Sequence, residues 1–236
     1  MTPRDALALV LSFGYVILIL AGAFLMRRSR ASSAALRVFV HVAVGLWIVP
    51  TVLLFDTRWW AMAPPGAFVF ANAVARPRSV YAAFLRDGRR DWGLVFFPAA
   101  VALCIGLWWT VSGRAPVVSG VLCLALGDSA ASLVGRRWGK RRWRHLILHE
   151  AAAGGKTVEG SAALCVVCSL VAAGTLAAFA GVQPPAALAA GVVVGLAAAA
   201  AEALTPGRLD NLALPLVAAL YTDLMLRWII ALGGAP

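Results

Sequence analysis

Eight apolar stretches, each close to the length of a membrane-spanning helix, occupy most of this sequence. A helix that crosses the hydrocarbon core of a bilayer needs about 20 residues, and soluble domains carry about a quarter charged residues, whereas only 13% of these 236 residues are charged. We therefore expect an all-α, polytopic transmembrane helix bundle of about eight spans (seven or eight), forming a single integral membrane domain over residues 1–236. The stretches fall at 6–26, 36–55, 58–75, 92–111, 115–135, 157–181, 184–204 and 210–233.

The stretch at 58–75 is the weakest of the eight. It is short and contains Pro64, Pro65 and Gly66, residues that disfavour a regular helix. A re-entrant or interfacial segment here is the alternative, and it would reverse the orientation of everything that precedes it.

Basic residues alternate between the loops. Of the 21 lysines and arginines, 17 follow the first, third, fifth and seventh stretches, in numbers of four, five, seven and one. Positive residues collect in cytoplasmic loops, so this pattern predicts that both termini lie outside and that the basic loops, with the site they carry, are cytoplasmic. The net charge of +11 also suits an anionic ligand. We expect an integral protein of a bacterial inner membrane.

Five ionisable residues lie near the ends of the stretches on the predicted cytoplasmic side. Acidic residues inside a span are costly, and clustered carboxylates repel one another unless a cation intervenes. Magnesium binds one or two carboxylates together with phosphate oxygens and water, while Lys and Arg bind the remaining phosphate charge. The pattern predicts a magnesium–nucleotide site, and the alternative is carboxylate–arginine pairing that only stabilises the bundle. The five residues are His41, Asp128, Glu159, Glu202 and Asp210.

Three sequence blocks contain these residues. GDSAASLVGRRWGK (127–140) places Asp128 among small residues, with three cations at the end of the same predicted helix. KTVEGS (156–161) brings a lysine and a glutamate to the start of the sixth stretch, and EALTPGRLDNLALPL (202–216) joins the seventh to the eighth. Neither a Walker A loop nor a dinucleotide-binding fingerprint is present.

These blocks, in this order and spacing over 126–216, resemble the CTP-dependent polyprenol kinase family, which includes dolichol kinases, phytol kinases and CTP-dependent diacylglycerol kinases. RVFVHVAVG (37–45) resembles an upstream basic and histidine element of that family. The resemblance implies transfer of the γ-phosphate of CTP, with Mg²⁺, to an isoprenoid alcohol of the polyprenol, dolichol or phytol type. Six residues match the polar motif positions of the family: Asp128, Lys156, Glu159, Glu202, Asp210 and Asn211.

We assign expected roles on this basis. Catalysis is expected from His41, Asp128, Lys156 and Glu159, and metal binding from Asp128, Glu202 and Asp210. Which carboxylate is a base and which is a metal ligand stays open. The residues expected to bind the nucleotide are Arg136, Arg137, Lys140, Lys156, Thr157 and Asn211.

Other functions remain as alternatives. A CTP-dependent diacylglycerol kinase differs only in the acceptor lipid. Cytidylyltransferases similar to CDP-diacylglycerol synthase end in an HGG-x-x-DR-x-D element, whereas this chain reads GRLDNLALP (207–215). A transporter carries its polar groups near mid-membrane, whereas these acids cluster toward one surface. The expected partners are a lipid alcohol, CTP and membrane lipids, and nucleic acid is not expected.

Overall fold

The computed structural model describes residues 1–74, 92–143, 155–206 and 209–233. In these ranges the chain forms helices throughout, with one isolated β-bridge between Arg142 and Thr157, which confirms the all-α prediction. The helices are α1 (Pro3–Arg28), α2 (Ser33–Leu46), α3 (Ile48–Leu54), α4 (Arg58–Val74), α5 (Gly93–Trp108), α6 (Arg114–Leu122), the π-helix η2 (Cys123–Asp128), α7 (Ser129–Trp138), α8 (Val158–Ala180), α9 (Pro184–Leu204) and α10 (Asp210–Ala231).

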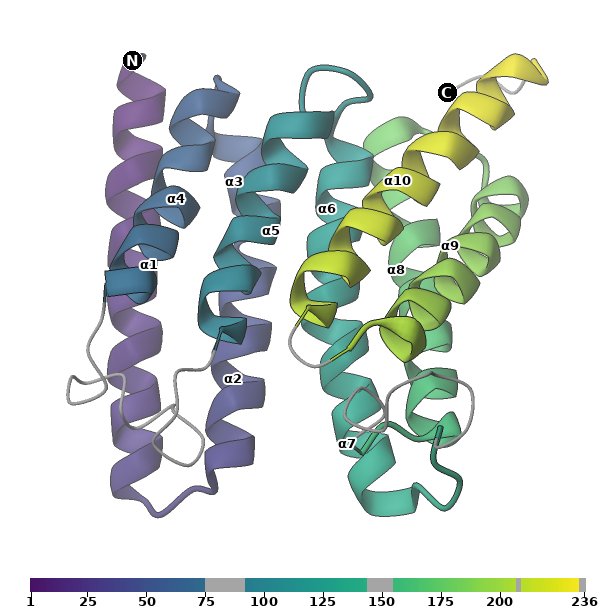
Figure 1. The fold of residues 1–236 in the computed structure, drawn as a ribbon. Helices are drawn as coiled ribbons and strands as arrows, with labels where there is room; N and C mark the ends of the chain where they lie inside the picture. Colours follow the sequence, from purple (N-terminus) through teal and green to yellow (C-terminus); the bar gives the residue numbers. More distant parts are fainter. Residues whose placement is uncertain (75–91, 144–154, 207–208, 234–236) are drawn as a thin grey trace.

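The eight predicted stretches correspond to eight helical passes that alternate in direction (Figure 1). Within the described ranges, six helices are long and apolar enough to cross a membrane; α2 joins α3 in one of them, and α6, η2 and α7 join in another. The third and fourth stretches form the shorter helices α4 and α5, of 17 and 16 residues. Pro64 and Pro65 lie inside α4 without ending it.

Four helices stop partway through the bundle. In Figure 1 the last turns of α4 and α9 and the first turns of α5 and α10 lie about midway along α1. The rod formed by α6, η2 and α7 continues past this level, as do α1, α2 and α8. Polar residues at these four helix ends therefore lie at a similar depth inside the bundle.

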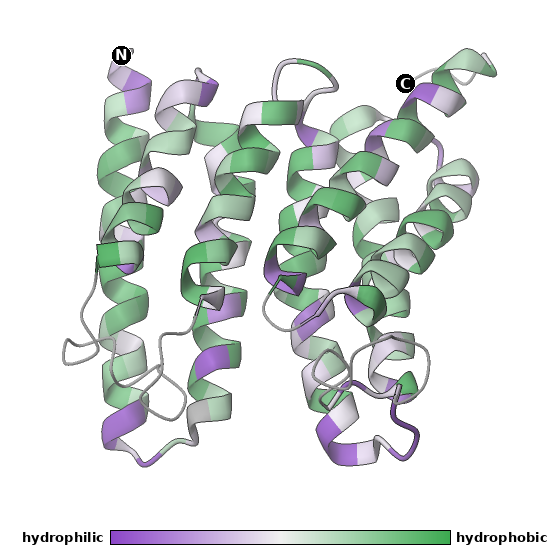
Figure 2. Ribbon diagram, in the orientation of Figure 1, coloured by the Kyte–Doolittle hydropathy of each residue, from purple (hydrophilic) through white to green (hydrophobic). Residues whose placement is uncertain are grey.

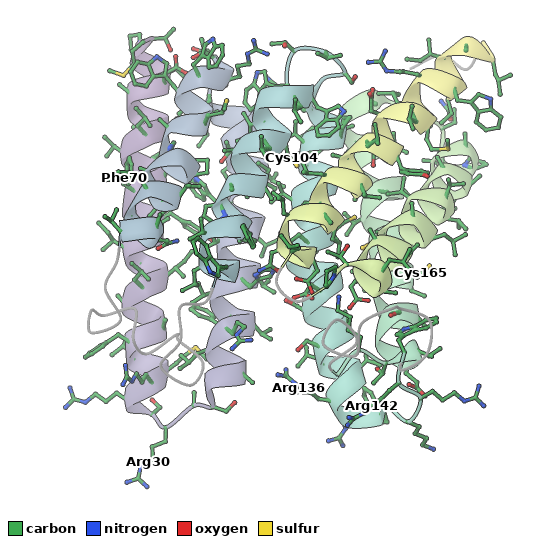
Figure 3. All side chains as sticks on the ribbon, viewed as in Figure 1. Arg30, Phe70, Cys104, Arg136, Arg142 and Cys165 are labelled. Carbon is green, nitrogen blue, oxygen red and sulfur yellow. The ribbon has the colours of Figure 1, made fainter. Side chains whose placement is uncertain are left out.

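One end of the bundle carries a concentration of exposed basic residues. Arg30 between α1 and α2, Arg136 in the last turn of α7 and Arg142 between α7 and α8 all lie at this end (Figure 3), and we call it the basic end. Figure 2 shows hydrophilic segments at both ends and at the level where α9 ends and α10 begins, with apolar helix surface between them. Helix α1 begins and α10 ends at the opposite end, as the charge pattern requires. The basic residues predicted at 76–90, 144 and 208 lie outside the described residues.

Small residues allow α8 and α9 to pack closely. A Cβ atom added at Gly191 would collide with the carbonyl oxygen of Ser169, and one added at Gly195 would collide with the Ser169 hydroxyl and the Cys165 carbonyl. Close approach through small residues is how helices associate in lipid. This contact fixes the position of the last turn of α9 relative to the start of α8, where the polar residues meet.

Candidate active site

Lys156 lies at the centre of a buried polar cluster. Its Nζ is 3.5 Å from Glu202 Oε1 and 3.2 Å from Asp210 Oδ2, and the side chains of these three residues are 14%, 7% and 16% exposed. The ammonium also donates to the carbonyl oxygens of Glu202 and, at 3.0 Å, Thr205. We call Lys156, Glu202 and Asp210 the Lys156 cluster. It joins the start of α8 to the end of α9 and the start of α10, which are the positions that the sequence predicted to converge.

The contact of Lys156 with the end of α9 has an electrostatic reason. The last carbonyl groups of a helix lack partners within the helix and carry its partial negative charge. The Lys156 ammonium binds two of them at the end of α9 and faces two carboxylates as well. One cation therefore neutralises several oxygens that would otherwise repel one another.

The backbone of Lys156 is held by a short antiparallel pairing. Trp143 N donates to the Lys156 carbonyl at 3.3 Å, and Val158 N donates to the Arg141 carbonyl at 2.9 Å. Thr157 caps α8, since its hydroxyl accepts from Gly160 N at 3.1 Å. Thr157 is thus placed as the N-cap of α8.

Ser161 links this segment to Glu202. Its hydroxyl donates to Glu202 Oε2 at 3.0 Å and accepts from the indole nitrogen of Trp143 at 3.1 Å. Glu202 therefore has a partner on each carboxylate oxygen. The sequence reasoning did not assign Ser161 or Trp143 to the site, although Ser161 stands in the second sequence block and Trp143 stands three residues after the first.

Asp128 is the last residue of the π-helix η2, which interrupts the rod of α6 and α7. A π-helix widens the turn and displaces one backbone carbonyl, and such segments occur frequently at functional sites. The Asp128 side chain is half-buried and lies within electrostatic range of Glu202 and Cys168. The sequence predicted an uninterrupted helix here, so the change of helix type is a finding of the structure.

His41 contacts the same π-helix from α2. Its Nε2 lies 3.3 Å from the Leu124 carbonyl oxygen, and because a carbonyl only accepts, Nε2 carries the hydrogen. In the neutral ring Nδ1 is then left as an acceptor. The imidazole packs against Phe97, with 4.6 Å between ring centroids, and lies within electrostatic range of Asp210.

Asn211 ties the cluster to α5. Its Nδ2 donates to the Gly93 carbonyl at 3.3 Å, and its backbone N–H donates to Asp210 Oδ1 at 2.9 Å. The first turn of α10 is thereby fixed against the first turn of α5. A carboxylate in the first turn of a helix is also stabilised by the helix dipole.

Four of the predicted site residues lie apart from the Lys156 cluster. The Glu159 carboxylate accepts from Arg141 N at 3.3 Å on both oxygens, so it stabilises the pairing beside α8. Arg136, Arg137 and Lys140 are exposed at the end of α7, where Arg137 stacks over Trp138 and Arg136 points away from the bundle (Figure 3).

The donor set suits a hard divalent cation only in part. Across the described chain, no three His, Cys, Asp or Glu side chains converge closely enough to hold a metal by themselves. Magnesium does not require such a cage, because it keeps several waters and binds through one or two carboxylates plus phosphate oxygens. With Glu202 and Asp210 ionised, the Lys156 cluster carries two carboxylates against one ammonium, and Asp128 lies within electrostatic range of Glu202. The residues therefore fit Mg²⁺ arriving with a phosphate ligand.

Comparison with known proteins gives one similarity over most of the chain. A phytol kinase from Synechocystis sp. is 28% identical over 203 residues, which cover 86% of this chain and 84% of that protein. No family model matches the chain, and no solved structure matches it.

Proposed function

The similarity to a phytol kinase supports membership of the polyprenol and phytol kinase family, and from this premise we propose that the chain transfers the γ-phosphate of CTP to an isoprenoid alcohol. At family level the similarity supports a prenyl-alcohol kinase, and the long apolar helices support an integral membrane protein. The choice of CTP, the cytoplasmic membrane surface as the place of reaction and the bacterial inner membrane as the location are the finer parts of the proposal.

One observation carries the proposal: Lys156 pairs with Glu202 and Asp210 at the ends of α9 and α10 inside the bundle. Each of these helix ends continues into an apolar span. On the other side, the helix ends face the basic end of the bundle (Figure 2). A phosphorylated nucleotide arrives from water and a prenyl alcohol arrives from lipid. A charged cluster at this level lies between the basic end and the apolar spans, where the two substrates would meet.

Phosphoryl transfer requires positioning and charge stabilisation more than covalent chemistry from the protein. Lys156 is proposed to stabilise the charge of the transferred phosphate, with Asn211 contacting the nucleotide or the metal shell. Mg²⁺, when bound by Asp128 with Glu202 or Asp210, would supply charge neutralisation at the phosphate oxygens. Arg136, Arg137 and Lys140 are proposed to attract the nucleotide from solution, because exposed cations increase the local concentration of anions.

The hydroxyl of the alcohol needs a group that orients it and takes its proton. Asp128 and His41 are the two residues proposed for this step. Both lie on the π-helix side of the site, Asp128 as its last residue and His41 as the donor to its Leu124 carbonyl. Because Nε2 is the donor in this bond, Nδ1 of His41 is the ring nitrogen that can accept a proton. Glu159 and Thr157 are proposed to act through the backbone that carries Lys156, since their contacts are to that segment.

The experiment reconstitutes the full chain in nanodiscs and supplies γ-labelled CTP or ATP with Mg²⁺. The acceptors are phytol, farnesol, an undecaprenol-length polyprenol and diacylglycerol. Label on an isoprenoid alcohol with CTP as the better donor is the expected result. Label on diacylglycerol alone, or release of pyrophosphate with phosphatidate, supports one of the two alternative lipid enzymes. If no nucleotide is consumed with any lipid, the proposal is wrong and a transport role is the remaining candidate.

A further inference from the structure

A proline in α5 leaves one backbone carbonyl without its helical partner. Pro98 lies inside α5, and because proline has no N–H, the carbonyl of Leu94, four residues earlier, loses its ordinary donor. The side chain of Asn72, from α4, replaces it: Asn72 Nδ2 donates to the Leu94 oxygen at 2.6 Å. Asn72 therefore has a structural reason to point toward α5.

This bond fixes the orientation of the Asn72 amide. A carbonyl oxygen accepts only, so the nitrogen of the amide must face Leu94 and Oδ1 must face away. Oδ1 is buried and has no hydrogen-bond partner among the residues that the structure describes. A buried polar atom without a partner is costly, and such an atom in a native structure needs an explanation.

The unpartnered oxygen is linked to the candidate active site through the first turn of α5. Asn72 binds the carbonyl of Leu94, and Asn211 binds the carbonyl of the preceding residue, Gly93. The two asparagines thus flank the first turn of α5, and Asn211 directly follows Asp210 of the Lys156 cluster. The first turn of α5 is the link between Asn72 and the cluster.

The last turns of α4 carry exposed apolar side chains on the face opposite to Asn72, because residues two positions apart project from opposite sides of a helix. Phe70 is 73% exposed and Val74 is 58% exposed on the same last turns of α4, and Phe70 lies on the outer side of this helix (Figure 3). These turns end midway along the bundle (Figure 1). A ligand from this apolar face must pass to the α5 side of α4 to reach Asn72 Oδ1. Such a ligand must be mostly apolar and must carry one hydrogen-bond donor.

Resting on the proposed function, we propose that Asn72 Oδ1 accepts a hydrogen bond from the hydroxyl of the prenyl alcohol as the alcohol enters the site. A prenyl alcohol is a long apolar chain with a single O–H donor, whereas phosphate oxygens and ionised carboxylates only accept. Asn72 is then a specificity residue that selects a free hydroxyl over an ether or an ester. Sites that bind a hydroxyl through a buried polar group reject analogues that lack it.

The test measures binding without nucleotide, so that it does not depend on transfer. Tritiated phytol is displaced from the chain in nanodiscs by unlabelled phytol or by phytyl methyl ether, which cannot donate. Replacement of Asn72 alone would orphan the Leu94 carbonyl, so each substitution is made with Pro98→Ala, which restores a backbone N–H at position 98. The variants are P98A, N72L/P98A and N72D/P98A, the last of which keeps an acceptor.

We expect wild type, P98A and N72D/P98A to bind phytol about tenfold more tightly than the ether, as one hydrogen bond to a buried acceptor provides. The ratio should fall to about one in N72L/P98A. Partitioning of the two ligands into lipid cancels, because each ratio is compared between variants. In the transfer assay the KM for phytol should rise about tenfold in N72L/P98A, with kcat little changed.

The inference is wrong if N72L/P98A keeps the preference of P98A, because water or a protein group would then satisfy Oδ1. It is also wrong if the wild-type chain does not distinguish phytol from its ether. Failure of the proposed function gives a different result, namely no nucleotide-dependent labelling of any alcohol by the wild-type chain.

Discussion

Replacing Lys156 with methionine (K156M) removes the ammonium that contacts both carboxylates of the Lys156 cluster while retaining the length and most of the volume of the side chain. The variant leaves Glu202 and Asp210 buried and facing each other without their shared cation. It also removes the donor to two carbonyl groups at the end of α9. We expect a large loss of stability together with loss of phosphate transfer.

The magnitude follows from the two distances. At an effective dielectric constant of about 20, charges 3.2 and 3.5 Å apart attract by about 5 kcal/mol each. Desolvation of three buried groups offsets much of this attraction, and removal of one partner from a buried ion pair costs about 3–5 kcal/mol in practice. We therefore expect K156M to lower the free energy of unfolding by about 3–5 kcal/mol.

The assay is equilibrium denaturation of the purified chain in mixed micelles, with R227M as the control. Arg227 pairs with one carboxylate, that of Asp223, at 2.9 Å, and the two side chains are 56% and 9% exposed. Its loss should cost less than the loss of Lys156, because Lys156 is itself buried and pairs with two carboxylates. The double variant K156M/D210N removes one of the two repelling charges and should regain part of the stability without regaining transfer. The reasoning is refuted if K156M is as stable as R227M, or if D210N gives no recovery in the K156M background.

Two further substitutions test the packing and the chemistry around the π-helix. Gly127→Ala should cost about 1–3 kcal/mol, because the added Cβ would lie 2.6 Å from Cys168 Sγ; an unchanged thermal unfolding midpoint would contradict this packing. His41→Gln keeps a nitrogen donor for the carbonyl of the π-helix but removes the ring acceptor. If His41 takes the proton of the alcohol, H41Q should lose transfer as fully as H41A, with a lower kcat and an unchanged KM for CTP. Substantial kcat in H41Q with none in H41A would make His41 a positioning residue and leave the proton to Asp128.

The passes of the bundle could be predicted because hydrophobicity alone determines where a chain enters lipid. The alternation of basic loops also predicted correctly that α1 begins and α10 ends opposite the basic end. The bounds of α4 and α5 lie within three residues of the predicted stretches at 58–75 and 92–111, but the apolar pattern did not predict that each helix has one end midway along the bundle (Figure 1). Those ends depend on contacts such as the bond from Asn72 to Leu94.

The pairing within the site was partly predictable. The predicted topology assigned Glu202 and Asp210 one depth. Lys156 is distant from both in sequence, and the structure brings it into contact with both carboxylates. The π-helix that ends at Asp128 was not predictable, because CLALGD (123–128) has the apolar pattern of an ordinary helix. The hydrogen bond from the Arg141 backbone N–H to the Glu159 carboxylate was not predicted for a similar reason. An isolated backbone pairing produces no periodic sequence pattern.

The contact between Asn72 and the Leu94 carbonyl is one that the sequence did not predict. A lone asparagine in a weak apolar stretch gives no signal by itself. Its meaning comes from Pro98, 26 positions later, which frees a carbonyl that only a neighbouring helix can satisfy. A search for polar residues in one span and prolines in the next would have identified the pair as candidates.

The central claim is that the polar residues around the ends of α9 and α10 transfer phosphate to a prenyl alcohol. It is tested most directly by comparing D128N with D223N in single-turnover transfer from γ-labelled CTP to phytol in nanodiscs. Asp223 lies toward the opposite end of α10, paired with Arg227, so its substitution controls for the loss of a buried acid. We predict that D128N lowers the transfer rate by at least about 100-fold, as the loss of a group that stabilises the reacting charge does, while D223N stays within a few-fold of wild type. A D128N variant that transfers phosphate as fast as D223N would contradict the account.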